Sequence, residues 1–142
     1  MRFFHLSDLH IGKQLHRYTM KNEQEDILNK IVQAAEKEKP DAVVIAGDIY
    51  DKPVPSAEAV HLFDTFLTDL TELTPKIPVL LISGNHDSPE RLDYAAEILS
   101  KHKVYISGML PQTEQEHLKN VVLTDEYGPV NFYLVPYLNP GD

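Results

Sequence analysis

The sequence predicts an α/β fold in which mostly parallel β-sheet layers are covered by helices. Two apolar runs, at 42–46 and 78–82, show no alternation with polar residues, which is typical of strands buried on both faces of a parallel sheet. Segments with apolar residues at three- and four-residue steps separate these runs. This repeated strand–helix–strand order favours parallel strands joined by right-handed crossovers, with helices on both faces of the sheet.

The first elements are a short strand and a long helix. Phe3, Phe4 and Leu6 indicate the strand, and a helix is predicted to begin at Asn22, with Glu25 as its capping-box partner. A proline at position 40 ends this helix before the run at 42–46. Ser56 is expected to cap a helix over 56–73, and Ser88 a helix over 89–100. Strands are expected over 78–82 and 104–106. A hairpin that turns at 125–129 is expected within 121–135.

Length, composition and charge exclude several classes of protein. At 142 residues the chain fits one domain, and 42% apolar residues suffice for a core. The absence of cysteine excludes disulfides, cysteine-ligated metal sites and thiol catalysis. A net charge of −9 does not offer a generic basic groove for nucleic acid. The N-terminus resembles neither a signal peptide nor a membrane anchor, so a cytoplasmic protein is expected.

Polar residues gather directly behind three of the predicted strands. Asp8 and His10 follow the first strand, Asp48 follows the second, and the run 84–87 (Gly-Asn-His-Asp) follows the third. Because the carboxyl ends of parallel strands meet at one edge of the sheet, we expect these groups to become neighbours. Each cluster taken alone is more simply explained as residues of a turn or a helix cap. The three clusters together favour a functional site.

The chemistry of these side chains is that of a metal centre. Asp8, His10, Asp48 and Asn85 offer carboxylate, imidazole and amide ligands, a set suited to manganese, iron or zinc rather than calcium. Asp48 is placed to bridge two ions, and two ions ~3.5–4 Å apart would clamp a phosphate and convert a bound water into hydroxide.

The motifs Asp8-Leu9-His10, Gly47-Asp48-Ile49-Tyr50-Asp51 and Gly84-Asn85-His86-Asp87 resemble the first three motifs of the calcineurin-like metallophosphoesterases. More narrowly, the chain resembles the N-terminal half of the bacterial exonuclease subunits in that family, which are related to nucleases of double-strand-break repair. The resemblance spans roughly the whole chain.

The resemblance implies a role for each motif residue. Asp8, His10 and the bridging Asp48 would hold one ion, usually Mn²⁺ in this branch, and Asp48 with Asn85 would hold the other. His86 would act as the catalytic histidine that supports the leaving oxygen, although it is also suited to be a ligand itself.

Three residues near these motifs have alternative roles. Asp87 is expected either to orient His86 or to cap the following helix. Lys13 and Arg17, in a small basic patch behind the first motif, are candidates for phosphate contact, with an ordinary exposed loop as the simpler interpretation.

The chain departs from the family pattern in its later motifs. The family completes its metal site with three histidines in Gly-His and Gly-His-x-His motifs, which are missing here. His102 and His117 are expected at the surface, and His5 and His61 are expected to be structural residues, His5 within a buried first strand. The domain expected over 1–142 is therefore the N-terminal half of a nuclease domain, without its C-terminal part or capping region. A turn-like ending at 139–142 is taken as a hint of a longer protein.

Three functions follow as hypotheses. The leading one is a metal-dependent DNA nuclease acting in DNA repair and recombination, with DNA and an SMC-like ATPase as partners and a homodimer implied by the resemblance. The metal motifs would act only on a phosphoryl group and do not distinguish one phosphate ester from another. A phosphomonoesterase or nucleotide phosphodiesterase is therefore an alternative. The third is a non-catalytic interaction fragment, whose helices at 56–73 and 89–100 would expose a dimerisation face.

Overall fold

A computed structural model describes residues 1–141 and contains a four-stranded parallel sheet in the order β1-β4-β5-β6. The strands are β1 (Phe3–Leu6), β4 (Ala42–Ala46), β5 (Val79–Ile82) and β6 (Val104–Ser107). The central strands β4 and β5 are mostly buried, because each has a neighbour on both edges and is covered on both faces. The predicted α/β class with a parallel sheet is thus confirmed.

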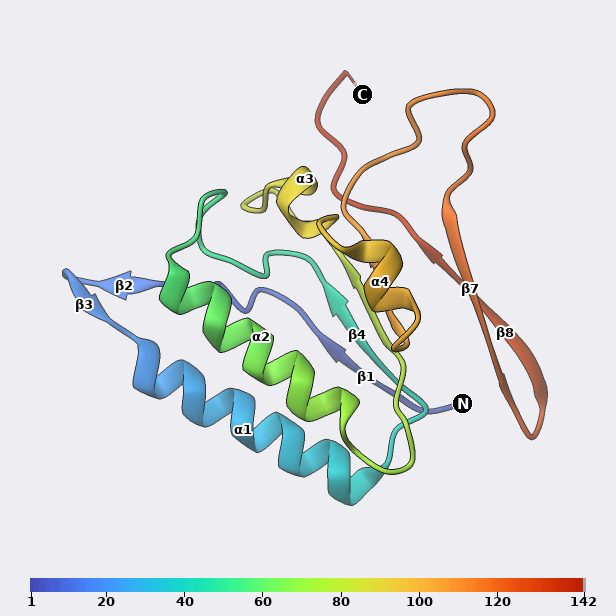
Figure 1. Cartoon of the computed structure of the whole chain (residues 1–142), viewed down its shortest axis with the longest axis horizontal. Helices are drawn as coiled ribbons and strands as arrows, with labels where there is room; N and C mark the ends of the chain where they lie inside the picture. The colour runs from blue at the N-terminus through green and yellow to red at the C-terminus, as the bar shows by residue number, and fades with distance from the viewer. Residues whose placement is uncertain (142) are drawn as a thin grey trace.

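The described helices lie over one face of this sheet (Figure 1). They are α1 (Lys21–Glu38), α2 (Ala57–Thr71), α3 (Pro89–Leu92) and α4 (Ala96–Ser100). Their apolar side chains form one core with Val43, Ile45 and Leu81 of the sheet. Burial of this apolar surface is the main stabilising contribution to such a layered fold.

The opposite face of the sheet is covered by a β-hairpin instead of helices, so helices on both faces are not observed within residues 1–141. The hairpin consists of β7 (Lys119–Asp125) and β8 (Gly128–Leu134), paired antiparallel as predicted. Val121 and Leu134 pack against Ala42 and Leu80 of the sheet. A second small ribbon, β2 (Gln14–Leu15) with β3 (Tyr18–Thr19), was not predicted and projects from the body of the molecule (Figure 1).

The helix caps predicted from the sequence are confirmed only in part. Ser56 caps α2 as predicted, its hydroxyl accepting a hydrogen bond from the Ala59 N–H at 3.1 Å. The capping box predicted at the start of α1 is wrong. The helix begins at Lys21, and its N-cap residue, Met20, makes no side-chain cap hydrogen bond.

The helix predicted over 89–100 is broken. Ala95 adopts a left-handed conformation with φ of 60° between α3 and α4. This turn allows both Leu92 and Leu99 to pack against the sheet core.

The first strand is less buried than expected. It lies at the edge of the sheet and pairs only with β4, so His5 is exposed rather than a core histidine. His61, His102 and His117 are also exposed. No helix within residues 1–141 combines the length and apolar character needed to cross a membrane.

Candidate metal centre

The loops that follow β1 and β4 run side by side at the carboxyl edge of the sheet. The N–H of Asp8 donates to the Gly47 carbonyl at 3.2 Å, and the N–H of His10 donates to the Asp48 carbonyl at 3.0 Å. A parallel bridge between Ile11 and Tyr50 extends this pairing beyond the strands. The register of the two strands is therefore carried into the loops, which brings the first two predicted clusters together.

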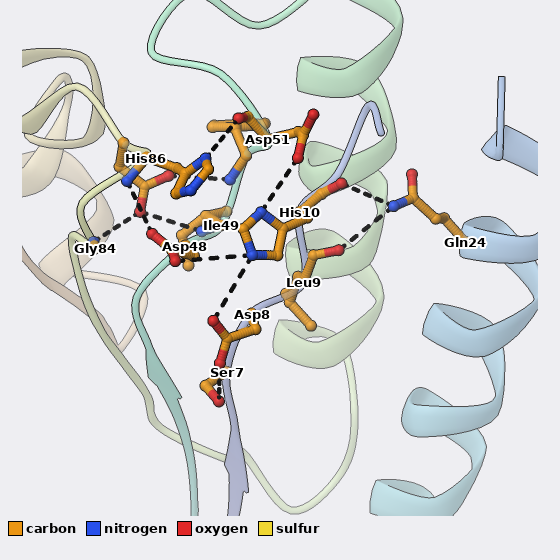
Figure 2. Close-up of polar contacts among 12 residues, drawn as sticks. Ser7, Asp8, Leu9, His10, Gln24, Asp48, Ile49, Asp51, Gly84 and His86 are labelled. Atoms are coloured by element: carbon orange, nitrogen blue, oxygen red, sulfur yellow. Dashed lines mark hydrogen bonds and ion pairs between the residues drawn. The ribbon is translucent and has the colours of Figure 1, made fainter. Parts of the chain in front are cut away.

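His10 lies at the centre of this rim (Figure 2). Its Nε2 atom is 3.7 Å from Asp8 Oδ1 and 3.7 Å from Asp48 Oδ2. His10, Asp48 and His86 each offer one ligand atom, and these atoms lie within 4.8 Å of one another. Bonds of ~2.0–2.2 Å to a shared cation place ligand atoms at most ~4.4 Å apart, so these side chains need to close by only a few tenths of an ångström to share one. The side chains converge as expected, while their roles as ligands stay predictions.

Asn85 and the unpartnered nitrogen of His10 complete the donor groups at this rim. The side-chain amide of Asn85 lies against Asp48, and with its nitrogen toward the carboxylate it would donate to Oδ1 and Oδ2 at 3.2 and 3.1 Å. The buried Nδ1 of His10 makes no hydrogen bond, although Asp51 Oδ1 lies 3.3 Å away. This donor set therefore fits the divalent ions expected from the sequence.

The backbone at the rim is held in a costly conformation. Asp8, His10 and Asp48 all have left-handed φ angles, of 55°, 46° and 50°. For non-glycine residues this conformation costs on the order of 1–2 kcal/mol each, and such residues gather at functional sites. The surrounding hydrogen bonds must hold these three residues in place, because an isolated loop would relax.

Gly84 allows the loop after β5 to approach Asp48 closely. A Cβ atom at position 84 would lie 2.2 Å from Asp48 Oδ1 and 2.3 Å from the Asp48 backbone nitrogen. The same carboxylate oxygen accepts a hydrogen bond from the His86 N–H at 2.9 Å. The absence of a side chain at position 84 is thus what lets the third cluster join the other two.

His86 is oriented through its ring nitrogen Nδ1, which lies 3.0 Å from the carbonyl oxygen of Asp51. This hydrogen bond raises the pKa of His86 above its ordinary 6.5; the carboxylates of Asp48, Asp51 and Asp87 add to the effect and desolvation opposes it. The exposed imidazole ring packs edge to face against His10, with ring centres 4.9 Å apart. His86 is close enough to be a ligand or a proton donor at this rim.

Asp87 makes backbone contacts that neither expectation included. Its buried carboxylate accepts hydrogen bonds from the backbone N–H groups of Ile49, Tyr50 and Gly84, at 3.1, 3.0 and 2.8 Å. Ser88 rather than Asp87 caps α3, and the ring nitrogen Nδ1 of His86 pairs with Asp51, so an orienting effect of Asp87 on His86 stays a prediction. A carboxylate satisfies three N–H groups well because its two oxygens accept several hydrogen bonds. Asp87 ties the loop after β5 to the loop after β4.

Two residues at the site were missed from the sequence. Asp51 contacts His10 through its carboxylate and His86 through its carbonyl, and its position three residues after Asp48 was the available signal. Gln24 on α1 bonds to the loop that carries His10, and nothing in the sequence pattern marked it.

The candidate phosphate contacts Lys13 and Arg17 are exposed. Lys13 stands next to the rim, since its N–H donates to the His10 carbonyl at 3.1 Å. Arg17 lies at the turn between β2 and β3, where it adopts a φ of 69°.

Comparison with known proteins agrees with this geometry. Residues 1–137 match the family model described as calcineurin-like phosphoesterase. The chain belongs to this family. Members of the calcineurin-like family depend on divalent metal ions, with which the cluster of His10, Asp48 and His86 is compatible.

Individual relatives cover nearly all of the chain. It is 35% identical over 137 residues to a protein of Staphylococcus saprophyticus that is named as the SbcD component of the nuclease SbcCD, and 36% identical over 137 residues to the protein of that name from Staphylococcus epidermidis. Each match covers 96% of this chain but only 34% of the relative, so the chain spans about a third of the length of these proteins.

Proposed function

We propose that this chain forms the N-terminal part of a metal-dependent DNA nuclease of the SbcD type that acts in DNA repair and recombination. The observation that supports it best is the meeting of Asp8, His10, Asp48, Asn85 and His86 at one rim, in a family of metal-dependent phosphoesterases. The names of the staphylococcal relatives support the choice of a nuclease over other phosphoesterases.

Each rim residue has a task in this proposal. Asp8, His10 and Asp48 would hold one ion, and Asp48 with Asn85 would hold the second, both of them Mn²⁺. Held there, such ions would neutralise the phosphate charge and lower the pKa of water for attack at neutral pH. The Nδ1–H of His86 donates a hydrogen bond to the Asp51 carbonyl. The other ring nitrogen of His86 then faces the leaving oxygen of the phosphodiester. Lys13 and Arg17 contact neighbouring phosphates.

The proposal extends to partners and location. DNA is the substrate, and an SMC-like ATPase, SbcC, is the expected partner because the relatives are named as components of an SbcCD nuclease. A cytoplasmic location follows from such a substrate. The domain over 1–142 is the N-terminal part of the nuclease domain, and the remaining ligands of the metal pair come from outside this chain.

A homodimer is supported by an apolar groove between α2 and the segment that contains α3 and α4. The groove has a volume of about 460 Å³, and Val60, Phe63, Leu67 and Leu99 are among the residues that line it. Val60 and Tyr94, also in the lining, are 45% and 82% exposed. Light scattering on Val60→Asp and the unaltered chain tests this: the proposal expects a dimer that the substitution converts to a monomer.

The deciding experiment uses the longer protein that contains this chain. Asp48→Asn and His86→Ala are each expected to abolish Mn²⁺-dependent cleavage of a DNA duplex end, with far-UV circular dichroism unchanged. Asp64→Asn and His117→Ala, exposed residues outside the rim, are the matched controls. Cleavage retained in either rim variant would refute the residue assignment. Preference for p-nitrophenyl phosphate over DNA would favour a phosphomonoesterase instead.

The 142-residue chain on its own should bind the metal pair weakly and cleave DNA little or not at all, because the later histidines of the family are missing from it. Turnover equal to that of the longer protein would contradict this expectation.

A further inference from the structure

Gln24 reaches from the first turn of α1 to the loop that carries His10. Its Nε2 donates to the carbonyl oxygens of His10, at 2.8 Å, and of Leu9, at 3.4 Å. Its Oε1 accepts a hydrogen bond from the N–H of Gly12 at 3.0 Å. Figure 2 shows the two bonds from Nε2, with the amide lying on the opposite side of the loop from Asp48. The half-buried side chain thus binds three parts of one short loop.

This loop needs support from both sides. On one side its N–H groups at positions 8, 10 and 11 pair with carbonyls of the loop after β4. The left-handed φ angles of Asp8 and His10 prevent it from continuing as a regular strand, so its carbonyls at positions 9 and 10 turn toward α1. Those carbonyls require donors, because backbone groups removed from water are costly to leave unpaired. The carboxamide of Gln24 supplies a donor to the Leu9 carbonyl and a second donor, beside the Lys13 N–H, to the His10 carbonyl.

We propose that Gln24 is a positioning residue for the metal centre: by clamping residues 9–12 it fixes the His10 imidazole toward Asp8 and Asp48. This inference rests on the proposed function, since it assigns Gln24 to the same rim. Gln24 itself contacts no ligand atom, and it acts only through the backbone of the loop.

The chemistry of the contact requires a carboxamide. The side chain must donate two hydrogen bonds and accept one, and glutamine does both. A glutamate at position 24 would still accept from Gly12 but would turn a carboxylate toward two carbonyl oxygens. An alanine would leave all three backbone groups without this partner. Groups that orient metal ligands typically change metal affinity by about 10- to 100-fold when removed.

The test compares Gln24→Glu and Gln24→Ala with Gln33→Glu and Gln33→Ala in the 142-residue chain. Gln33 lies on the same helix and is exposed, so its variants match the change in charge and in helix propensity. Mn²⁺ is titrated while the broadening of backbone amide signals is followed by NMR, which detects weak binding. Co²⁺ is titrated in parallel, and its visible absorption spectrum at saturation reports the coordination geometry.

The inference expects Mn²⁺ and Co²⁺ affinity to fall about tenfold or more in both Gln24 variants, with a changed Co²⁺ spectrum at saturation and an intact circular dichroism spectrum. The Gln33 variants should behave as the unaltered chain. Unchanged affinity and spectrum in the Gln24 variants, with metal still bound at the rim of the unaltered chain, would overturn the inference and leave the proposed function standing.

Two other outcomes would also overturn it. Loss of folding in both Gln24 variants would assign the residue a structural role. Absence of metal-induced broadening around Asp8, His10 and Asp48 in the unaltered chain, even at millimolar Mn²⁺, would overturn the inference for this chain, while cleavage by the longer protein would still decide the proposed function.

Discussion

Gly84→Ala is the substitution whose effect the structure specifies most directly. The new methyl group would lie 2.2 Å from Asp48 Oδ1, 2.3 Å from the Asp48 nitrogen and 2.8 Å from its Cγ. Ordinary contact needs ~3.5 Å or more, so the loops after β4 and β5 must separate by about 1 Å. One of the obstructing atoms belongs to the backbone, which means that a change of side-chain rotamer cannot relieve the clash.

The cost can be worked out from what the separation would break. Overpacking of this kind typically costs about 1–3 kcal/mol. The movement also strains the hydrogen bond from the His86 N–H to Asp48 and the one from the Gly84 N–H to Asp87, at about 1 kcal/mol each or more. We therefore expect a loss of about 3–5 kcal/mol in the free energy of unfolding, equivalent to a melting temperature lower by roughly 10–20 °C for a chain of this length. Divalent metal binding should weaken as well, because Asp48 is displaced.

Urea unfolding followed by circular dichroism measures the first effect, and Mn²⁺ titration measures the second. Gly128→Ala is the control: its Cβ would meet nothing within 4 Å, but its φ of 124° is unfavourable for alanine. That variant should lose about 1–3 kcal/mol from backbone strain alone and keep its metal affinity. If Gly84→Ala matches the unaltered chain in both stability and metal binding, the close packing of the two loops is not required and the reasoning fails.

Two further predictions concern other polar contacts. Asp87→Asn should destabilise the fold by about 1–3 kcal/mol in urea unfolding, because one amide oxygen cannot replace two carboxylate oxygens that accept from three backbone N–H groups; stability equal to that of Asp64→Asn would contradict this. The N-terminal amine of Met1 lies 2.7 Å from Asp125, and their hydrogen bond raises the pKa of the amine above 8.0 and lowers that of Asp125 below 3.8. This pair therefore stabilises the fold between about pH 4 and 8, and its contribution is lost as pH rises through the raised amine pKa or falls through the lowered Asp125 pKa. Urea unfolding of the unaltered chain and Asp125→Asn across about pH 3–10 should show a difference confined to that range, and a constant difference would argue against the pair.

Much of the fold could be predicted because its signals are local. The runs at 42–46 and 79–82 are apolar throughout because strands with two neighbours and two covered faces meet no solvent, and Ser56 marks its helix because a hydroxyl can satisfy a free N–H group. The break at Ala95 carries no such signal, since alanine favours helices, and its left-handed turn goes with tertiary contacts: Leu92 and Leu99 pack onto the sheet core, and Asp93 accepts a hydrogen bond from the Gly108 N–H.

The placement of the helices on one face follows from the order of the strands rather than from any segment. The strands succeed one another in a single direction, β1-β4-β5-β6, and right-handed crossovers that always advance in one direction place every connecting helix on the same side. Sequence reasoning gave parallel strands without their order, so it assigned helices to both faces. The exposure of His5 has the same origin, because only the strand order makes β1 an edge.

For the site, the sequence by itself determined which side chains can bind a metal and that each of them follows the end of a strand. Asp8, Asp48 and Asn85 each come shortly after an apolar run that forms a strand. Only the tertiary structure decided how they are held. Asp87 fastens two loops, Asp51 orients His86, and Gln24 supports the loop of His10, and all three act on groups far away along the chain. Hydrogen bonds between distant segments depend on distances and angles that no local residue pattern encodes.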